Sequence, residues 1–269
     1  MEKEEIKGFV KKKYAQAAAQ DTSCCGAGDS TPVSIVGNAY TEREISSAPE
    51  GSNLSLGCGN PIAHAAIREG DTVLDLGSGA GFDCFLAALK VGDAGRVIGV
   101  DMTPEMVERA KANARKGGYG NVEFRLGEIE KLPVDDVSID LVISNCVINL
   151  VPDKATAFGE AFRVLRPGGG LMVSDIVLLS ELPDAIKSSV EAYAGCLAGA
   201  ALKDDYLTYI EQAGFEELSV LEETSLDPES LCSDPLIREI VEKLKLTPDK
   251  ANEIAGSIAS MKISALKPE

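Results

Sequence analysis

Glycines and carboxylates occur together at one point of the chain in a pattern that suits ligand binding. The stretch Asp75-Leu-Gly77-Ser-Gly79-Ala-Gly81 follows a short apolar run and precedes a helical pattern. Glycines at such a turn let the backbone approach a ligand closely, and a helix N-terminus offers unpaired N–H groups. Asp101 ends the next apolar run. A carboxylate at that position can accept hydrogen bonds from both hydroxyls of an adenosine ribose.

The spacing of this loop separates three classes of ligand. A dinucleotide-binding loop needs a third glycine where this chain has Phe82, and a phosphate-binding P-loop needs a lysine after Gly81. Neither residue is present. Asp75 would also repel a pyrophosphate. A ligand that carries an amino group and no phosphate, such as S-adenosylmethionine, suits this acidic loop better.

Cysteines form the second group of residues with chemical potential. Cys146 follows the fourth apolar run, Cys58 lies upstream of the first, Cys196 lies beyond the fifth, and Cys24 and Cys25 are adjacent near the N-terminus. None of the spacings is Cys-x-x-Cys, and one histidine cannot complete a zinc-finger pattern, so structural zinc is not indicated. Thiolates gathered at one edge of a sheet would favour a soft, thiophilic ion or metalloid.

Strands and helices alternate from residue 71 onwards, and these elements must position the candidate residues. We expect strands at 72–76, 96–101, 122–126, 138–144 and 170–177, and helices at 82–90, 104–116 and 156–165. This alternation predicts a parallel sheet covered on both faces. Further on, helices are expected at 184–197, 204–213, 235–245 and 249–258, and strands at 216–221 and 261–265. Ligands of such sheets bind at the carboxyl ends of the strands, where Cys146 lies.

Three parts are expected along the chain. Residues 1–70 comprise an amphipathic helix at 2–20 and a cysteine-bearing cover segment rich in Ser, Gly, Pro and Asn; long irregular segments of this kind are often lids. Residues 71–222 form the core, and residues 223–269 a small C-terminal lobe. Helical turns are expected at 41–46 and 61–67.

Composition restricts the function further. The 269 residues include 26 Lys+Arg and 43 Asp+Glu, which gives a formal charge of −17. Phosphate contacts need clustered Lys and Arg, so a nucleic-acid substrate is not expected, and an anionic membrane surface is disfavoured for the same reason. No run reaches the roughly 20 apolar residues of a transmembrane helix. The acidic N-terminus lacks the apolar core of a signal peptide, which predicts a cytoplasmic protein whose cysteines are thiols.

The segments VLDLGSGAG, GVDMTPEM and LRPGG resemble the motifs of class I S-adenosylmethionine-dependent methyltransferases. The resemblance implies an α/β fold with a Rossmann-like, doubly wound and mostly parallel sheet. It also assigns residues to the methyl donor: Asp75, Gly77, Gly79 and Gly81 flank the methionine moiety, Asp101 holds the ribose, Met102 packs on the adenine, and Glu128 and Ile129 recognise the adenine edge.

A narrower resemblance covers nearly the whole chain. YTEREISSAPEGSNLSLGCGNP, SNCVINL, GCLAGA and the closing ISALKP are similar to segments of the arsenite S-adenosylmethionine methyltransferases. The resemblance implies that Cys58, Cys146 and Cys196 bind trivalent arsenic, and that an N-terminal cysteine forms a transient disulfide with Cys58. Cys24 and Cys25 are both candidates for that role. Thioredoxin or a small thiol would then be the reductant. Tyr40 would contact the methyl donor and Asn145 would line its pocket.

Two other functions compete with this interpretation. One is a methyltransferase for a small organic acceptor, such as a quinone or lipid precursor, in which the cysteines are incidental. The other is a non-catalytic metalloid binder that uses the cofactor fold as a scaffold. Cys84 and Cys232 are interpreted as small packing residues, because a free cysteine is most often one. Asp135 and Asp136 are interpreted as a polar turn.

Overall fold

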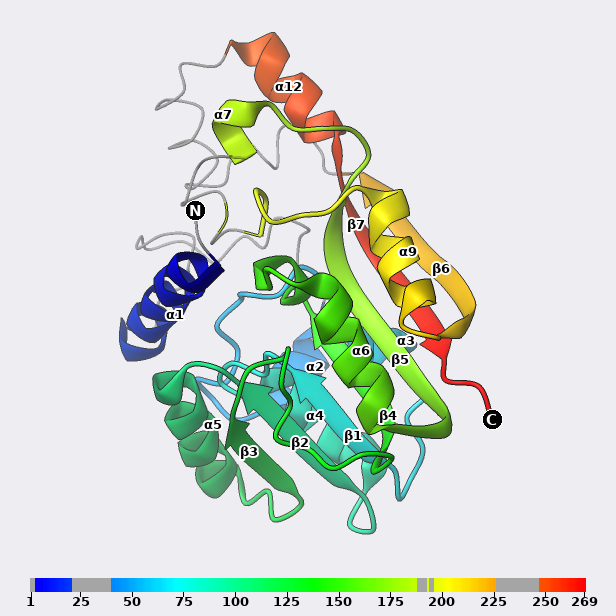
Figure 1. Ribbon diagram of the computed structural model, residues 1–269. Helices are drawn as coiled ribbons and strands as arrows, with labels where there is room; N and C mark the ends of the chain where they lie inside the picture. The colour runs from blue at the N-terminus through cyan, green and yellow to red at the C-terminus, as the bar shows by residue number, and fades with distance from the viewer. Residues whose placement is uncertain (1–2, 21–39, 188–192, 194–195, 226–246) are drawn as a thin grey trace.

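A sheet of seven strands lies at the centre of the part of the chain that the structure describes (Figure 1). The computed structural model describes residues 3–20, 40–187, 193, 196–225 and 247–269. The strands are β1 (Thr72–Leu76), β2 (Arg96–Asp101), β3 (Val122–Leu126), β4 (Ile139–Asn145), β5 (Leu165–Leu178), β6 (Glu216–Ser225) and β7 (Ile258–Leu266). The first five occur where the apolar runs predicted them.

The order of the strands is β3-β2-β1-β4-β5-β7-β6. The first five pair in parallel, whereas β7 runs antiparallel to both β5 and β6. Along the sheet, the strand order therefore reverses between β1 and β4, and ligands of open α/β sheets bind at such a switch point. The expected mostly parallel, doubly wound α/β fold is confirmed.

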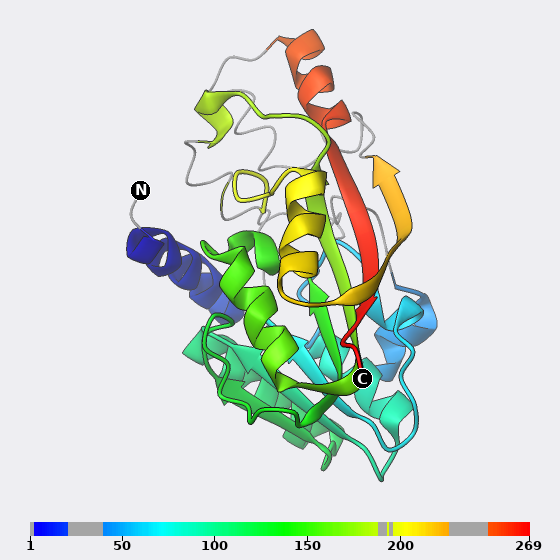
Figure 2. The same ribbon diagram turned by 45° about the vertical axis from the view of Figure 1, so that its right-hand side comes forward.

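Helices cover both faces of this sheet (Figures 1 and 2). They are α1 (Lys3–Gln20), α2 (Glu42–Ser47), α3 (Pro61–His64), α4 (Phe82–Val91), α5 (Pro104–Gly117), the 3-10 turn η1 (Ile148–Leu150), α6 (Lys154–Val164), α7 (Asp184–Lys187), α9 (Lys203–Gln212) and α12 (Pro248–Gly256). Helices α4, α5 and α6 pack against strands of the sheet, whereas α1 packs against α5. On α4, for example, Phe85 and Val91 are completely buried.

Some expected elements have other bounds in the structure, and some are not described. β5 begins five residues before the expected strand, because Leu165 already pairs with Ile139 ahead of an irregularity in the register. Within the expected helix at 184–197, α7 covers Asp184–Lys187 and Tyr193 is helical, whereas 188–192 and 194–195 lie outside the described residues. The expected helix at 235–245 and the cysteines Cys24, Cys25 and Cys232 also lie outside the described residues.

The C-terminal strand β7 belongs to the main sheet. It lies between β5 and β6 and pairs with β5 along its whole length, from Gly170↔Leu266 to Leu178↔Ile258. The strand expected at 261–265 is thus longer than predicted and forms part of the core, with Met261 and Ile263 completely buried. The division of the chain into three parts remains a prediction.

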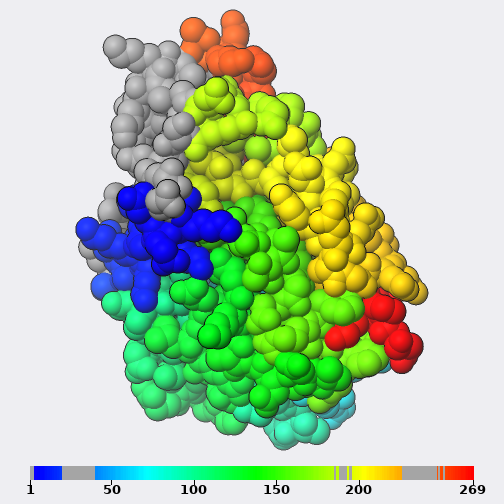
Figure 3. Space-filling model, in the orientation of Figure 1, coloured from blue at the N-terminus to red at the C-terminus, as the bar shows by residue number. Residues whose placement is uncertain are grey.

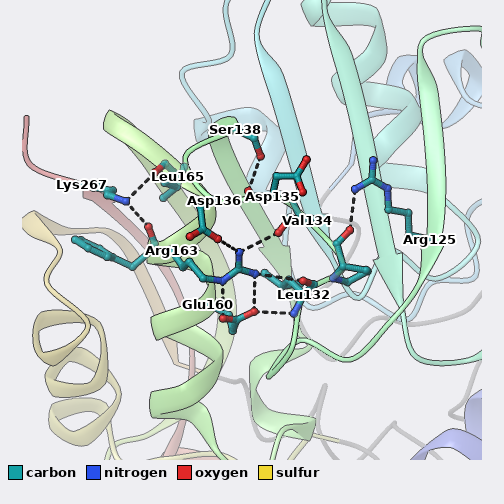
Figure 4. Close-up of polar contacts among 12 residues, drawn as sticks. Arg125, Leu132, Val134, Asp135, Asp136, Ser138, Glu160, Arg163, Leu165 and Lys267 are labelled. Carbon is teal, nitrogen blue, oxygen red and sulfur yellow. Dashed lines mark hydrogen bonds and ion pairs between the residues drawn. The ribbon is translucent and has the colours of Figure 1, made fainter.

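Arg163 on α6 holds the segment between β3 and β4 in place (Figure 4). Its guanidinium donates to the carbonyl oxygens of Val134 and Leu132 at 2.9 and 3.2 Å and pairs with Glu160 and Asp136. Asp136 thus has a structural partner, as a polar turn requires. This segment carries the residues expected to face the adenine of the donor.

Helix α1 lies on the outside of the molecule beside α5 (Figures 1 and 3). The Arg109 guanidinium on α5 donates to the Ala18 carbonyl at 2.7 Å and to the Gly51 carbonyl at 2.9 and 3.0 Å. One side chain therefore joins the end of α1 and the loop after α2 to the core. Among the described residues, none of the helices combines the length and the apolar character that crossing a bilayer requires.

Candidate active site

A cavity opens at the carboxyl ends of β1, β2 and β4, and most of the residues predicted to bind the methyl donor line it. They are Tyr40, Asp75, Gly77, Gly79, Asp101, Met102, Glu128, Ile129 and Asn145. Lys7, Val10 and Tyr14 of α1 line the same cavity and were not predicted. Helix α1 therefore forms part of the wall around the ligand.

The glycine loop has the conformation that its sequence predicts. Gly77 and Gly79 have φ values of +66° and +51°, in the region that favours glycine. The Gly79 N–H donates to Oδ2 of Asp101 at 3.0 Å, and the Thr103 N–H donates to Oδ1 at 2.8 Å. The carboxylate of Asp101 is thereby fixed at the end of β2, beside the loop.

Gly81 differs from the other loop glycines because it does not line the cavity. It precedes α4 with a φ of +95°, and a Cβ there would lie 2.6 Å from Cζ of Phe124. Packing under the loop explains why glycine is needed here, and the predicted contact of Gly81 with the donor remains a prediction.

Three buried carboxylates surround the cavity, and one of them was not predicted. Asp75, Asp83 and Asp101 are 3%, 8% and 8% exposed. Burial raises the pKa of all three, and the charge of Asp83 raises the pKa of Asp75 further. The pKa of Asp83 reaches about 6. Unpaired buried carboxylates are costly, so this cavity favours a cationic ligand.

Cys84 interacts with the first of these carboxylates. Its thiol donates to Oδ2 of Asp75 at 3.1 Å, and both side chains are buried. Cys84 also belongs to the apolar core around α4, as expected of a packing cysteine. Burial raises the pKa of its thiol well above the usual value, so it stays protonated and acts as a hydrogen-bond donor.

Asp83 belongs to a polar network that the sequence did not reveal. The Tyr40 hydroxyl donates to Oδ1 of Asp83 at 2.6 Å, and the Asn145 amide donates to Oδ2 at 3.0 Å. The same amide donates to the Tyr40 hydroxyl at 2.8 Å. Asp83 directly follows the glycine loop and is a charged residue on the otherwise apolar face of a helix. This unusual position was the feature of the sequence that could have indicated a role for Asp83.

The three cysteines predicted to bind arsenic meet next to this cavity. Cys58, Cys146 and Cys196 are 3%, 6% and 4% exposed and belong to one buried cluster. Cys58 and Cys146 are joined by a disulfide with a Cα–Cα distance of 5.5 Å, and the Cys196 thiol donates to the Cys146 carbonyl at 3.2 Å. Cys146 also lines the donor cavity, so the two sites share a wall.

Backbone strain occurs at two of these cysteines. Cys146 and Cys196 have φ values of +58° and +63°, which residues other than glycine rarely adopt. Such strained residues concentrate at functional sites, where the surrounding structure enforces them. Here the Cys146 N–H is held by the Ser174 carbonyl at 2.8 Å, immediately after β4.

A buried carboxylate, that of Asp175, lies beside the sulfur atoms of Cys58 and Cys146. A carboxylate oxygen of Asp175 and the sulfurs of Cys58 and Cys146 all lie within 4.8 Å of one another. The carboxylate accepts hydrogen bonds from the Asn149 amide at 2.8 Å and the Tyr206 hydroxyl at 3.0 Å. Burial raises the pKa of Asp175 to about 7.

The described residues add contacts to two of the predicted roles. Glu128 lines the donor cavity, and its exposed carboxylate pairs with Nζ of Lys7 at 2.7 Å, so it also ties α1 to the loop after β3. Its contact with the adenine remains a prediction. The disulfide partner of Cys58 is Cys146. The predicted partners Cys24 and Cys25 lie outside the described residues, so their pairing with Cys58 remains a prediction.

Comparison with known proteins agrees with this fold. A family model described as a methyltransferase domain matches residues 67–214. A solved arsenic(III) S-adenosylmethionine methyltransferase from Chlamydomonas reinhardtii is 36% identical, with a TM-score of 0.63, and the match covers 89% of this chain and 75% of that one. A putative sarcosine dimethylglycine methyltransferase from Galdieria sulphuraria, at 18% identity and a TM-score of 0.62, supports the fold alone.

Curated relatives are similar over most of this chain. An arsenite methyltransferase of Halobacterium salinarum is 47% identical over 81% of the chain and 59% of its own length. One from Aquipseudomonas alcaligenes is 37% identical over 82% of the chain and 64% of its own length. The chain thus spans about three fifths of the length of these relatives.

The fold and the donor cavity define a class I S-adenosylmethionine-dependent methyltransferase. Within that class, the chain belongs to the arsenite methyltransferase family.

Proposed function

We propose that this protein transfers methyl groups from S-adenosylmethionine to trivalent arsenic bound by Cys58, Cys146 and Cys196. The observation that carries the proposal is the position of Cys146, whose side chain belongs both to the cysteine cluster and to the wall of the donor cavity. A reactive atom bound by these sulfurs would lie beside the donor. Positioning two reactants in this way can lower a barrier by about 7–11 kcal/mol.

The residues of the cavity fit the donor. S-adenosylmethionine supplies a methyl group on a positively charged sulfonium and carries an ammonium group. Asp75 and Asp83 offer buried carboxylates that would pair with positive charge, and Asp101 would bind the ribose. Lys7 is the one basic residue among the described residues that line the cavity, and it is paired with Glu128 and Glu130.

The cysteines would hold the substrate. Each thiol would displace one hydroxide of arsenite; an As–S bond forms, an As–O bond breaks, and the thiol proton leaves with the hydroxide as water. Arsenic held by three sulfurs keeps one lone pair, which would attack the methyl carbon in line with the departing sulfur. This step needs no added base.

A reduction step must follow, because methylation leaves arsenic formally two electrons more oxidised. Two cysteine thiols can return these electrons and become a disulfide. Cys58 and Cys146 are bonded in this structure, and a disulfide of Cys58 with Cys24 or Cys25 would serve equally. A dithiol such as thioredoxin, or two small thiols in the reducing cytoplasm, would then regenerate both cysteines and become oxidised themselves.

One experiment tests this function directly. The protein is incubated with S-adenosylmethionine, arsenite and a thiol reductant, and the products are separated and identified by mass spectrometry. We expect methylated arsenic and S-adenosylhomocysteine to form together, and neither to form without arsenite. A metalloid binder without activity would release no S-adenosylhomocysteine. An enzyme for an organic acceptor would bind the donor and leave arsenite unmethylated.

A further inference from the structure

The side chain of Asn145 contacts both the donor cavity and the cysteine loop. Asn145 is the last residue of β4, directly before Cys146. Its amide nitrogen donates to the Gly59 carbonyl at 2.9 Å, and its amide oxygen accepts from the Cys58 N–H at 3.2 Å. One amide therefore binds the backbone on both sides of the Cys58 Cα atom.

The loop is shaped for this contact. A Cβ at Gly57 would lie 2.6 Å from Nδ2 of Asn145, so only glycine lets the backbone come this close. On the other side, the Ser260 hydroxyl of β7 donates to the Cys58 carbonyl at 3.2 Å. Besides the disulfide, the position of Cys58 relative to Cys146 is thus set by contacts to the ends of β4 and β7.

The same amide is bound to the residues that face the donor. Nδ2 of Asn145 also donates to Oδ2 of Asp83 at 3.0 Å and to the Tyr40 hydroxyl at 2.8 Å. Its two hydrogens are shared among three acceptors, so a change at Asp83 alters the bond to Gly59. The ammonium group that S-adenosylmethionine and S-adenosylhomocysteine share, placed beside Asp83, would draw that carboxylate towards itself and leave more of the amide for Gly59.

We propose that Asn145 is a positioning residue that couples the two substrate sites, so that an occupied donor cavity strengthens arsenite binding by holding the Cys58 loop in place. This inference rests on the proposed function. Linkage makes the effect reciprocal, because arsenite must then strengthen donor binding by the same factor. Coupling between sites is typically 5–150-fold.

The coupling is measured as a ratio of dissociation constants. Protein reduced with a phosphine and freed of it is dialysed against sodium arsenite, with and without saturating S-adenosylhomocysteine, and bound arsenic is quantified by mass spectrometry. We expect S-adenosylhomocysteine to lower the arsenite Kd of the wild-type protein at least about fivefold. In Asn145→Ala, the arsenite Kd rises about tenfold and the ratio falls towards one, since both backbone groups lose their partner.

A second variant separates positioning from general damage. Tyr40→Phe keeps the ring that packs edge-on against Phe82 at 4.8 Å. It removes the hydroxyl that Asp83 and Asn145 both contact, so the Asn145 amide keeps only Asp83 and Gly59 as acceptors. We expect an arsenite Kd without S-adenosylhomocysteine that is no higher than in the wild-type protein, and a reduced ratio, because the amide already binds Gly59 without the ligand. Asn121→Ala is the matched control, because that amide binds the Gly92 carbonyl at 3.0 Å away from both sites.

The outcomes distinguish this inference from the proposed function. If the wild-type protein yields no methylated arsenic, the proposed function fails. If it methylates arsenic and the ratio is one, or if Asn145→Ala and Tyr40→Phe both keep the wild-type ratio, then the coupling inference alone is wrong. Circular dichroism and thermal unfolding identify a variant that has lost its fold, in which case the remaining variant decides the question.

Discussion

At the scale of single residues, two kinds of side chain define the chemistry of this protein. Buried carboxylates at Asp75, Asp83 and Asp101 line a cavity with little compensating positive charge. Buried sulfurs at Cys146 and its two neighbours lie next to it. In the proposed function, the first group would select a positively charged ligand and the second a thiophilic atom.

Replacing a cysteine sulfur by the smaller oxygen of serine tests the substrate site. We predict that Cys146→Ser and Cys196→Ser keep S-adenosylhomocysteine binding within about threefold, because neither side chain supplies a charge to the donor. Both should lose arsenite methylation, since a hydroxyl is a poor ligand for a soft metalloid. Calorimetry and product analysis measure the two effects. Cys84→Ser is the control, and normal turnover in Cys146→Ser or Cys196→Ser would remove the proposed arsenic site.

The ionisation of Asp83 tests the donor site. With a pKa of about 6, this carboxylate is charged at pH 7.5 and mostly neutral at pH 5. The ammonium group that S-adenosylhomocysteine shares with the donor should bind the charged form of this carboxylate, so affinity should rise with pH and fall about tenfold for each unit below the pKa. Calorimetric titration of S-adenosylhomocysteine between pH 5 and 8 measures this slope. In Asp83→Asn the slope should become shallower; an unchanged slope would assign it to the other two carboxylates.

At the scale of elements, strand ends and loops bring these residues together. The loop after β1 and the end of β2 line the donor cavity. The end of β4 and the loop before α3 carry Cys146 and Cys58. The elements themselves are rigid, since their interior residues such as Val73 and Ile143 are completely buried. Function is thus confined to short connections on a stable sheet.

Two glycines of one loop should respond differently to the same substitution. Gly81→Ala places a methyl group against Phe124 and Phe85 at a φ of +95°, so we expect a loss of about 1–3 kcal/mol in the free energy of unfolding. At Gly79 a Cβ meets nothing within 4 Å, so Gly79→Ala should cost about 1 kcal/mol, from its φ of +51° alone.

Gly79→Ala should weaken donor binding more than Gly81→Ala does, because Gly79 lines the cavity and Gly81 does not. Urea unfolding gives the stability of each variant, and titration with S-adenosylhomocysteine gives its affinity. Equal stability losses in Gly79→Ala and Gly81→Ala would contradict the packing role of Gly81.

At the scale of the whole molecule, buried acids set the dependence of stability on pH. Burial raises the pKa of four carboxyls in the folded state: Asp75, Asp83, Asp101 and Asp175. Hydrogen bonds and ion pairs lower the pKa of others: Glu44, Glu123, Asp153, Glu160 and Glu222. The two groups act in different pH ranges.

The signs follow from linkage. Acids with a lowered pKa add stability as the pH rises towards their unfolded value near 4. Acids with a raised pKa lose stability as the pH rises from that value through their folded value, about 6 for Asp83 and about 7 for Asp175. We therefore predict maximal stability near about pH 5 and a decline towards pH 8. Urea midpoints from pH 4 to 9 measure the profile, and a midpoint that rises steadily to pH 8 would contradict it.

A bound donor should reverse part of this decline. S-adenosylhomocysteine at 100 times its Kd should stabilise the folded state by about 2.7 kcal/mol at pH 8. Below pH 6 this stabilisation should be smaller at the same concentration, because protonated Asp83 binds the ammonium group of the ligand less well.

Much of the fold could be read from periodicity. The strands β1, β2 and β3 begin and end at the predicted residues, because apolar runs bounded by glycine and proline define buried parallel strands. The edge of the sheet was harder to predict. β6 is largely exposed and β7 is antiparallel, and neither its position between β5 and β6 nor its full length follows from a local pattern.

The sequence alone determined which chemistry was available. It contains a glycine loop preceded by Asp75, an acid at the end of the next strand, Asp101, and cysteines in contexts that match one family. Only the folded chain decided which of these residues meet, because proximity across the sheet depends on strand order and on loop contacts that no spacing records. Cys58 forms a disulfide with Cys146, 88 residues away in the sequence, and Asn145 holds the backbone of Cys58 at the end of β4. Asp83 gained its role in the same way, through partners 43 and 62 residues away.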